Sequence, residues 1–333
     1  MNRMDFTQAV IRIKVLEKRL LSRARLERMV DAKDMDEVFR ILAETEYQQH
    51  LSNAARPEDY ENILSAELKR VYNLMDELTG EKIITQLLSL KYDYHNLKVL
   101  IKERVSGKPL TGLYVPYGSQ DLTKLKAAMS QEDYSDLEKR IGDALRETVA
   151  EYDKSKDPQM IDIVLDRHYY RHLRALADET EIPMFQEYVK NQVDFTNMKT
   201  LIRVKKMDKE MRFLDEVLLD GGSIDRDKIL YSINDSLDGI IIKFRKEDIG
   251  KSLTEGLESY RRTGRLSDFE KIIDNRLMEI NEPSRSIVFG PEPLFSYLHA
   301  KEAEIKALRI IMISKINKLS PEVIRERLRD LYV

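Results

Sequence analysis

The chain has 333 residues, of which 35% are charged, and it contains only 12 glycines and 9 prolines. This composition favours helices and predicts an all-α protein, long enough for two or three domains or for one array of repeated units. The nearly balanced formal charge of −3 gives no global field that would draw the chain onto nucleic acid, and the lack of cysteine excludes disulfides, thiolate chemistry and cysteine-ligated zinc.

The N-terminal segment predicts one amphipathic helix from Asp5 to Arg25, because its apolar residues recur at helical spacing. A shorter helix is expected around residues 34–44. The charged N-terminus differs from a signal peptide, and no apolar run approaches the ~18 residues that a membrane-spanning helix needs. We therefore expect a soluble, cytoplasmic chain.

A first helical hairpin follows. Pro57 opens the segment "PEDYENILSAELKRVYNLMDEL", since proline is favoured in the first turn of a helix, and "TGEK" ends it. A second long helix is predicted from about Glu81 to Val105. It carries the motif "DYHNLKVLIK", from Asp93 to Lys102.

The same pattern returns 101 positions later. Pro158 opens a long helix, Pro183 lies in the following break, and the next helix carries "DFTNMKTLIR", from Asp194 to Arg203. The register is constant over some forty residues, which is not expected of two unrelated hairpins. The two hairpins therefore predict an internal repeat.

A third, weaker copy covers residues 266–280 and 295–316. Aligning Glu304 to Leu308 with Asn197 to Leu201 keeps the lysine and the leucine but replaces the asparagine. The segments "YGSQDLTKL" and "GGSIDRDKI" also share a Gly-Ser turn that enters a short helix with an acidic cap. The chain is thus predicted to contain three helical repeats of about 100 residues, at 1–110, 111–217 and 218–333, forming either a closed pseudo-threefold body or an open solenoid.

The motif helices hold the candidate functional residues. In one interpretation their apolar stripe is core, the lysines are solvated, and Asn96 bonds a neighbouring backbone. In the other, the polar residues of the motif form a surface for a partner protein. The candidates for that interface are Asp93, Asn96, Lys98, Asp194, Asn197, Lys199 and Lys306.

Two other patterns suggest chemistry. "DIGKSL" has the Gly-Lys-Ser ending of a phosphate-binding loop, but Arg245 stands where that motif needs a glycine, five residues before Gly250. His168 and His172 have the i, i+4 spacing of a metal site, without a third ligand in sequence. A turn between helices and packed histidines are the alternative interpretations. We expect no catalytic residue, cofactor or metal.

The three hairpins, "RIKVLEKRLLSRARLERM" and "RILAETEY" near the N-terminus, and "SPEVIRERL" near the C-terminus together resemble the C subunit of the prokaryotic V/A-type rotary ATPase, a relative of the vacuolar d subunit. The resemblance covers essentially the whole chain. It implies a funnel-like, all-helical, non-catalytic connector that passes torque between two partners, the central-shaft subunits of D and F type and the membrane proteolipid ring. It also implies a peripheral position at the membrane, without insertion and without nucleic acid.

Two alternatives from other functional classes stay open. One is a free-standing helical scaffold for unrelated proteins. The other is a nucleotide- or metal-dependent enzyme that uses Gly250 to Ser252 or the two histidines.

Overall fold

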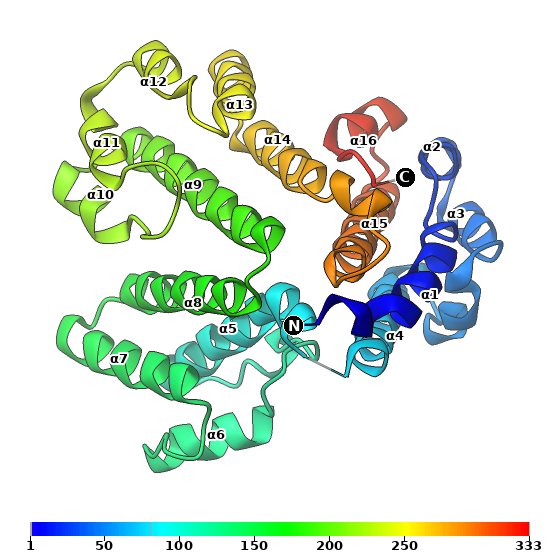
Figure 1. The fold of residues 1–333 in the computed structure, drawn as a ribbon, viewed down its shortest axis with the longest axis horizontal. Coiled ribbons are helices and arrows are strands. Elements are labelled where there is room, and N and C mark those ends of the chain that lie inside the picture. Colours follow the sequence, from blue (N-terminus) through cyan, green and yellow to red (C-terminus); the bar gives the residue numbers. More distant parts are fainter. Residues whose placement is uncertain (1, 81, 333) are drawn as a thin grey trace. The chain divides into compact units, whose positions relative to one another are not determined.

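The structure is a computed structural model that describes residues 2–80 and 82–332, and these residues form helices and loops without any strand (Figure 1). The all-α prediction is confirmed. None of the helices in these two ranges is long and apolar enough to cross a membrane. The chain divides into two compact units, one joining the residues up to Thr85 with those from Ser252 onward, the other comprising Gln86–Lys251.

The elements of the first unit come from both ends of the chain. They are η1 (Arg3–Phe6), α1 (Thr7–Glu17), α2 (Arg23–Asp31), α3 (Met35–Leu42), η2 (Glu46–Asn53), η3 (Pro57–Asp59), α4 (Tyr60–Thr79), α14 (Leu266–Glu279), η6 (Glu282–Ser286), α15 (Glu292–Ile316) and α16 (Pro321–Arg327).

The second unit is continuous in sequence. It contains η4 (Thr111–Leu113), α6 (Leu122–Gln131), α7 (Lys139–Ser155), α8 (Gln159–Thr180), α9 (Pro183–Lys206), α10 (Met211–Val217), α11 (Arg226–Leu230), η5 (Tyr231–Asn234) and α12 (Leu237–Phe244). Two helices cross the division between the units, α5 (Ile83–Ser106) and α13 (Gly250–Thr263).

The core of the first unit is built around α15, which contacts α1, α2, α3, α4 and α16. A proline in its first turn favours the helix start, and residues on all sides of α15 are buried along its length. Phe295, Leu298, Leu308 and Ile311 are inaccessible to solvent. Burial of each such side chain contributes roughly 1.5–3 kcal/mol to the stability of the fold through the hydrophobic effect. A helix this thoroughly enclosed fixes the positions of any polar groups that it carries.

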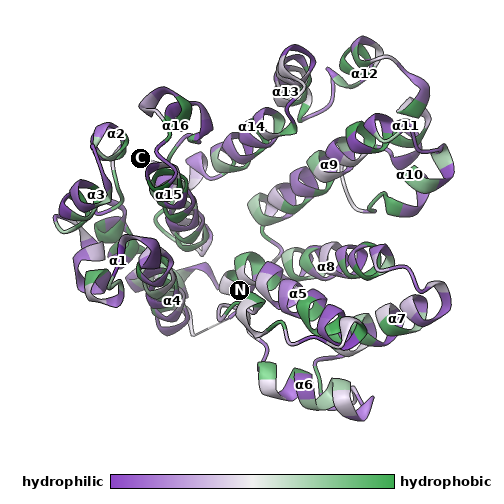
Figure 2. Ribbon diagram, turned by 180° about the vertical axis from the view of Figure 1, so that it is seen from behind, coloured by the Kyte–Doolittle hydropathy of each residue, from purple (hydrophilic) through white to green (hydrophobic). Residues whose placement is uncertain are grey.

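In the second unit α8 packs between α7 and α9. Hydrophobic and hydrophilic residues are interspersed along α8 and α9 (Figure 2). The buried residues of α8 gather on one side, as expected for a helix at the edge of a core, whereas those of α9 lie on all sides. Phe185, Val193, Met198 and Leu201 are among the fully buried residues of α9. Glu181 ends α8 in the left-handed conformation with a φ of 58°, and this turn redirects the chain into α9.

The single helix predicted for residues 5–25 is wrong, because α1 and α2 are separate helices. Ser22 caps the N-terminus of α2 with its hydroxyl. The backbone N–H of Leu21 donates to Glu304 on α15 at 2.5 Å. This buried contact gives the amide of Leu21 a partner outside the helix, and the chain turns there.

The other predicted helices are confirmed to within a few residues in α3, α4, α5, α8, α9, α14 and α15. The start predicted at Glu81 lies outside the described residues. The acidic caps that follow the two Gly-Ser turns are also confirmed, since Asp121 accepts from the first turn of α6 and Asp225 from that of α11. The division into repeats 1–110, 111–217 and 218–333 stays a prediction, as does their pseudo-threefold, funnel-like arrangement.

Candidate partner-binding residues and their surroundings

The first motif helix uses Asp93 and Asn96 to hold the loop that follows it. The Asn96 side chain donates to the Val115 carbonyl and accepts from the Val115 N–H, both at 2.9 Å. The Asp93 carboxylate accepts from the Ser119 hydroxyl at 3.0 Å and from the Gln120 N–H at 2.9 Å. We call these bonds the α5 clamp. Both motif side chains are buried.

The second motif helix repeats the arrangement. Asn197 donates to the Leu219 carbonyl and accepts from the Leu219 N–H, both at 2.8 Å. Asp194 accepts from the backbone N–H groups of Ser223 at 2.8 Å and Ile224 at 3.1 Å. We call these bonds the α9 clamp. The repeated Asp-x-x-Asn spacing thus serves the same structural task twice.

A glycine in each loop permits the close approach of the aspartate. A Cβ atom added to Gly118 would lie 2.2 Å from Oδ1 of Asp93, and one added to Gly222 would lie 2.0 Å from Oδ1 of Asp194. Neither distance is compatible with a side chain at the glycine. The Gly-Ser turns seen in the sequence are therefore the loop halves of the two clamps.

Burial dominates the electrostatics of both carboxylates. It raises the pKa of Asp93 and of Asp194, although the hydrogen bonds from each loop favour the charged form and oppose the shift. Asp93, Asn96, Asp194 and Asn197 are at most 5% exposed in this chain. The structure therefore places these four interface candidates inside their own unit, where they bond to their own backbone.

The third motif helix carries a different pair at the matching spacing, Lys301 and Glu304. Glu304 Oε1 accepts from Tyr47 Oη at 2.8 Å and lies 2.7 Å from Lys301 Nζ, while Oε2 accepts from Leu21 N–H. The position that holds a following loop in the first two copies thus holds the N-terminal segment in the third. The C-terminal copy closes onto the beginning of the chain.

A buried ionic network surrounds this pair. Lys301 also lies 3.3 Å from Oε1 of Glu67, and Arg70 makes two bonds to the Glu67 carboxylate at 2.8 and 2.9 Å. Burial alone would raise the pKa of Glu67. The hydrogen bonds and positive charges of Arg70 and Lys301 outweigh this effect, and the pKa of Glu67 lies below its ordinary value. Burial alone would lower the pKa of Lys301. The negative charge of Glu304, together with Tyr297 and Glu67, outweighs this effect, and the pKa of Lys301 lies above its ordinary value. The cations and anions keep each other charged inside the core.

Two of the candidate lysines form ion pairs in their own unit. Lys98 Nζ lies 2.6 Å from Asp166 and 3.7 Å from Asp162 on α8. Lys306 lies 2.5 Å from Asp274 on α14. These two lysines are therefore not simply solvated. Lys199 is half-buried on α9.

Two further ion pairs involve the motif helices. Lys102 on α5 lies 2.9 Å from Asp162 on α8, and Arg309 on α15 lies 2.6 Å from Glu61 on α4. Glu61 and Asp162 are aligned by the offset of 101 residues. Each pair joins a motif helix to the first helix of a hairpin. Both pairs are partly exposed and contribute at most ~1 kcal/mol each to stability.

Sequence reasoning missed Asp162 and Asp166 as partners of the lysines, although a signal was present. Asp162 and Asp166 are four residues apart on one helix, as Lys98 and Lys102 are on another. Complementary charges at the same spacing could have predicted that α5 and α8 lie side by side. The network around Glu67 had no comparable signal, because its members are scattered along the sequence.

The residues of the two enzyme-like motifs form hydrogen bonds with the surrounding protein. Gly250 begins α13, its N–H donates to Glu247 O at 2.7 Å, and a turn rather than a strand precedes it. His168 lies 2.8 Å from Glu147, and His172 lies 3.4 Å from Tyr94 Oη. Burial lowers the pKa of His172 to about 4. Within residues 2–80 and 82–332 there is no group of three or more metal-ligating side chains.

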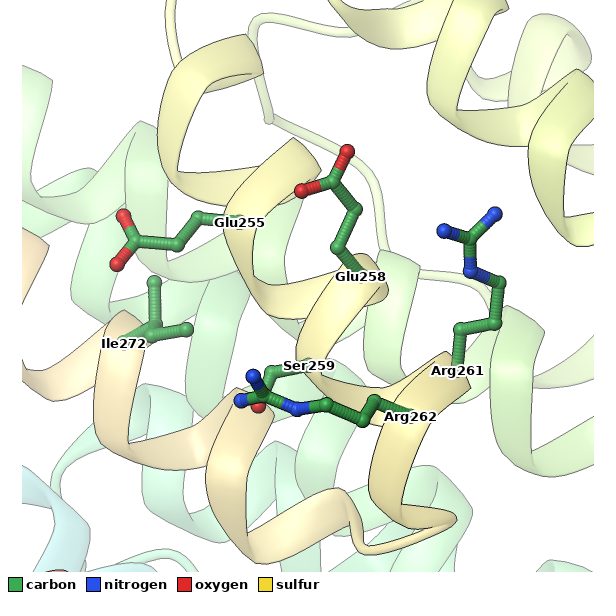
Figure 3. Close-up of a pocket in the computed structure, with 6 residues that line it drawn as sticks. All are labelled: Glu255, Glu258, Ser259, Arg261, Arg262 and Ile272. Carbon is green, nitrogen blue, oxygen red and sulfur yellow. The ribbon is translucent and has the colours of Figure 1, made fainter.

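A pocket of about 500 Å³ lies between α13 and α14 (Figure 3). Glu258 and Arg261 project from successive turns of α13 to the same side, while Ile272 enters from α14. Two glutamates and two arginines balance in charge around it. The lining residues are Glu255, Glu258, Ser259, Arg261, Arg262 and Ile272. The Ser259 hydroxyl in this lining makes no hydrogen bond to Glu255 or Glu258.

Comparison with known proteins gives a consistent result. The ATP synthase (C/AC39) subunit family matches residues 9–327, so the chain belongs to this family of non-catalytic ATPase subunits. Its relatives include the C subunit of the V-type sodium ATPase of Enterococcus hirae, 28% identical over 95% of both chains. Another is the C subunit of the A-type ATP synthase of Methanocaldococcus jannaschii, 25% identical over 96% of this chain and 85% of the relative. The resemblance noted from the sequence is confirmed.

Proposed function

We propose that this chain is the connector subunit of a rotary ATPase, joining the central shaft of D- and F-type subunits to the membrane proteolipid ring. In this role it transmits torque between ion movement in the ring and ATP hydrolysis or synthesis in the catalytic head. The observation that carries the proposal is the family match over residues 9–327, almost the entire chain. The subunit would lie at the membrane through these protein contacts.

The internal construction of the two units supports a mechanical role. A part that transmits torque must deform little, and both clamps fix a loop to a buried helix by four hydrogen bonds each. In the first unit, Glu304 joins α15 to the N-terminal segment. Opening either end of the chain would therefore expose part of a buried ionic network.

Of the interface candidates, the lysines are the ones whose side chains are not buried. The side chain of Lys98 is 23% exposed and that of Lys306 is 48% exposed. We propose that Lys98, Lys199 and Lys306 contribute charge complementarity to a partner surface. The four clamp residues support that surface from inside.

The proposal is tested in the complex from detergent-solubilised membranes, purified through a tag on a catalytic-head subunit. This chain should be present in a fixed ratio to the shaft subunits. A strain lacking the chain should yield a catalytic head and shaft that separate from the proteolipid ring. A chain that is absent from the purified complex, or an assembly that is unchanged without it, would support the free-standing scaffold instead.

A further inference from the structure

The N-terminal helix α1 has apolar residues on two opposite faces. One face is buried and packs on α15, with Ala9, Val10, Ile13 and Leu16. The opposite face exposes large apolar side chains, Ile11 at 62% and Val15 at 51%, and Met4 in the preceding turn at 60%. The α1 helix thus carries a second, exposed apolar stripe opposite its buried face.

Ile11 and Val15 are unusual residues for an exposed helix face. Both are β-branched, so they are weaker helix formers than the polar residues that usually occupy an exposed helix face. They lie four residues apart and share one side of the helix with Met4. An apolar stripe at this spacing is typical of a helix face that contacts another protein.

Two cations lie beside the stripe. Arg12 and Lys18 lie on the same face, and their side chains have no hydrogen bond or ion pair within the described part of the chain. Of the two nearby carboxylates, Glu17 forms an ion pair with Lys14, whereas Asp5 accepts a hydrogen bond from the neutral amide of Asn2. The α1 face is thus an apolar stripe with two unpaired cations.

From this arrangement we infer that the α1 face (Met4, Ile11, Arg12, Val15 and Lys18) is a docking surface for an acidic, partly apolar segment of another subunit of the complex. The inference rests on the proposed function for the presence of such a subunit. Apolar residues at the centre and charges at the rim match the usual composition of a protein interface. The unpaired cations select a partner of negative charge.

An anionic lipid surface would also attract the two cations, but the apolar part argues against it. Helices that lie in a membrane surface keep their whole apolar face free for the lipid. In α1 the larger apolar face is committed to α15, and the exposed stripe lacks aromatic residues. A protein partner fits the smaller stripe better.

The lack of cysteine in the natural chain makes a direct test possible. Full-length single-cysteine variants Ile11→Cys, Val15→Cys and, as control, Lys124→Cys on α6 are labelled with a maleimide, as free chains and within the complex. Lys124 is exposed, and its side chain has no partner among the described residues. We expect labelling at positions 11 and 15 to slow at least tenfold on assembly, well beyond any change at position 124.

The identity of the partner is read from a photo-crosslinker attached at Val15→Cys. The crosslinked peptide should come from another subunit and carry aspartate or glutamate next to apolar residues. Adding Arg12→Glu and Lys18→Glu should lower the crosslinking yield at least tenfold at low salt, whereas adding Lys124→Glu should leave it unchanged. High salt should also lower the yield, because exposed charges are screened over ~10 Å at 0.1 M ionic strength.

Each contrary outcome has a distinct meaning. Unchanged labelling at positions 11 and 15 in a complex that contains the chain overturns this inference and leaves the connector proposal intact. Protection by vesicles of phosphatidylserine and phosphatidylcholine, with no crosslink to protein, overturns it in favour of a lipid surface. A chain that is absent from the complex overturns both proposals.

Discussion

Replacing Asn197 by alanine should destabilise the second unit more than the matching replacement of Asn96. Asn197→Ala removes two hydrogen bonds and leaves the N–H and carbonyl of Leu219 without partners in a buried place. An unsatisfied buried backbone group costs about 1–3 kcal/mol, so the loss should be about 3 kcal/mol. Val115, which Asn96 holds, is only half-buried. Water can therefore bond the Val115 backbone in place of the Asn96 side chain. We expect Asn96→Ala to lower the unfolding free energy by about 1–2 kcal/mol.

The assay is urea unfolding followed by circular dichroism, together with hydrogen exchange of a peptide that contains Leu219. Asn197→Ala should lower the midpoint and speed exchange of the Leu219 amide by roughly a hundredfold, the equivalent of about 3 kcal/mol. Asn317→Ala is the control, because the exposed Asn317 side chain also bonds a backbone carbonyl, that of Ile313, at 2.7 Å. Equal midpoints for Asn197→Ala and Asn317→Ala, with unchanged exchange at Leu219, would refute the buried-clamp argument.

Three more predictions concern the second unit. Gly222→Ala should lower the urea midpoint by the equivalent of at least about 2 kcal/mol, because the new Cβ would collide with Asp194, and a wild-type midpoint would show that the loop adapts freely. Lys98→Glu should destabilise the isolated chain by about 1 kcal/mol and Asp166→Lys should restore it in the double variant, whereas additive losses would mean that the pair does not interact. Because burial lowers the pKa of His172 to about 4, protonation favours the unfolded chain, and the unfolding free energy should fall as the pH drops from 6.5 to 4. The fall is at most about 3 kcal/mol, and an equally steep profile in His172→Gln would assign it to other groups.

The sequence alone determined the helical class, the approximate bounds of the hairpin helices and the repeated motif. These features depend on local signals, namely apolar spacing, prolines in first turns and glycines in breaks. The repeated Asp-x-x-Asn and Gly-Ser segments could also be recognised as pairs, because both halves of each clamp recur in the same order. One of the two interpretations of Asn96, a hydrogen bond to neighbouring backbone, is confirmed by its bonds to Val115.

Only the tertiary structure decided what the weaker third copy does. In sequence, Glu304 is a departure from the motif, and Leu21 lies within an unbroken helical pattern. In the structure these two residues bond each other across 283 positions, and the predicted N-terminal helix divides there. The preference for a helix through Leu21 is worth only tenths of a kcal/mol per residue, whereas a buried carboxylate such as that of Glu304 must find hydrogen-bond donors. A contact between segments so distant leaves no periodic signal in either, and so the folded chain alone shows it.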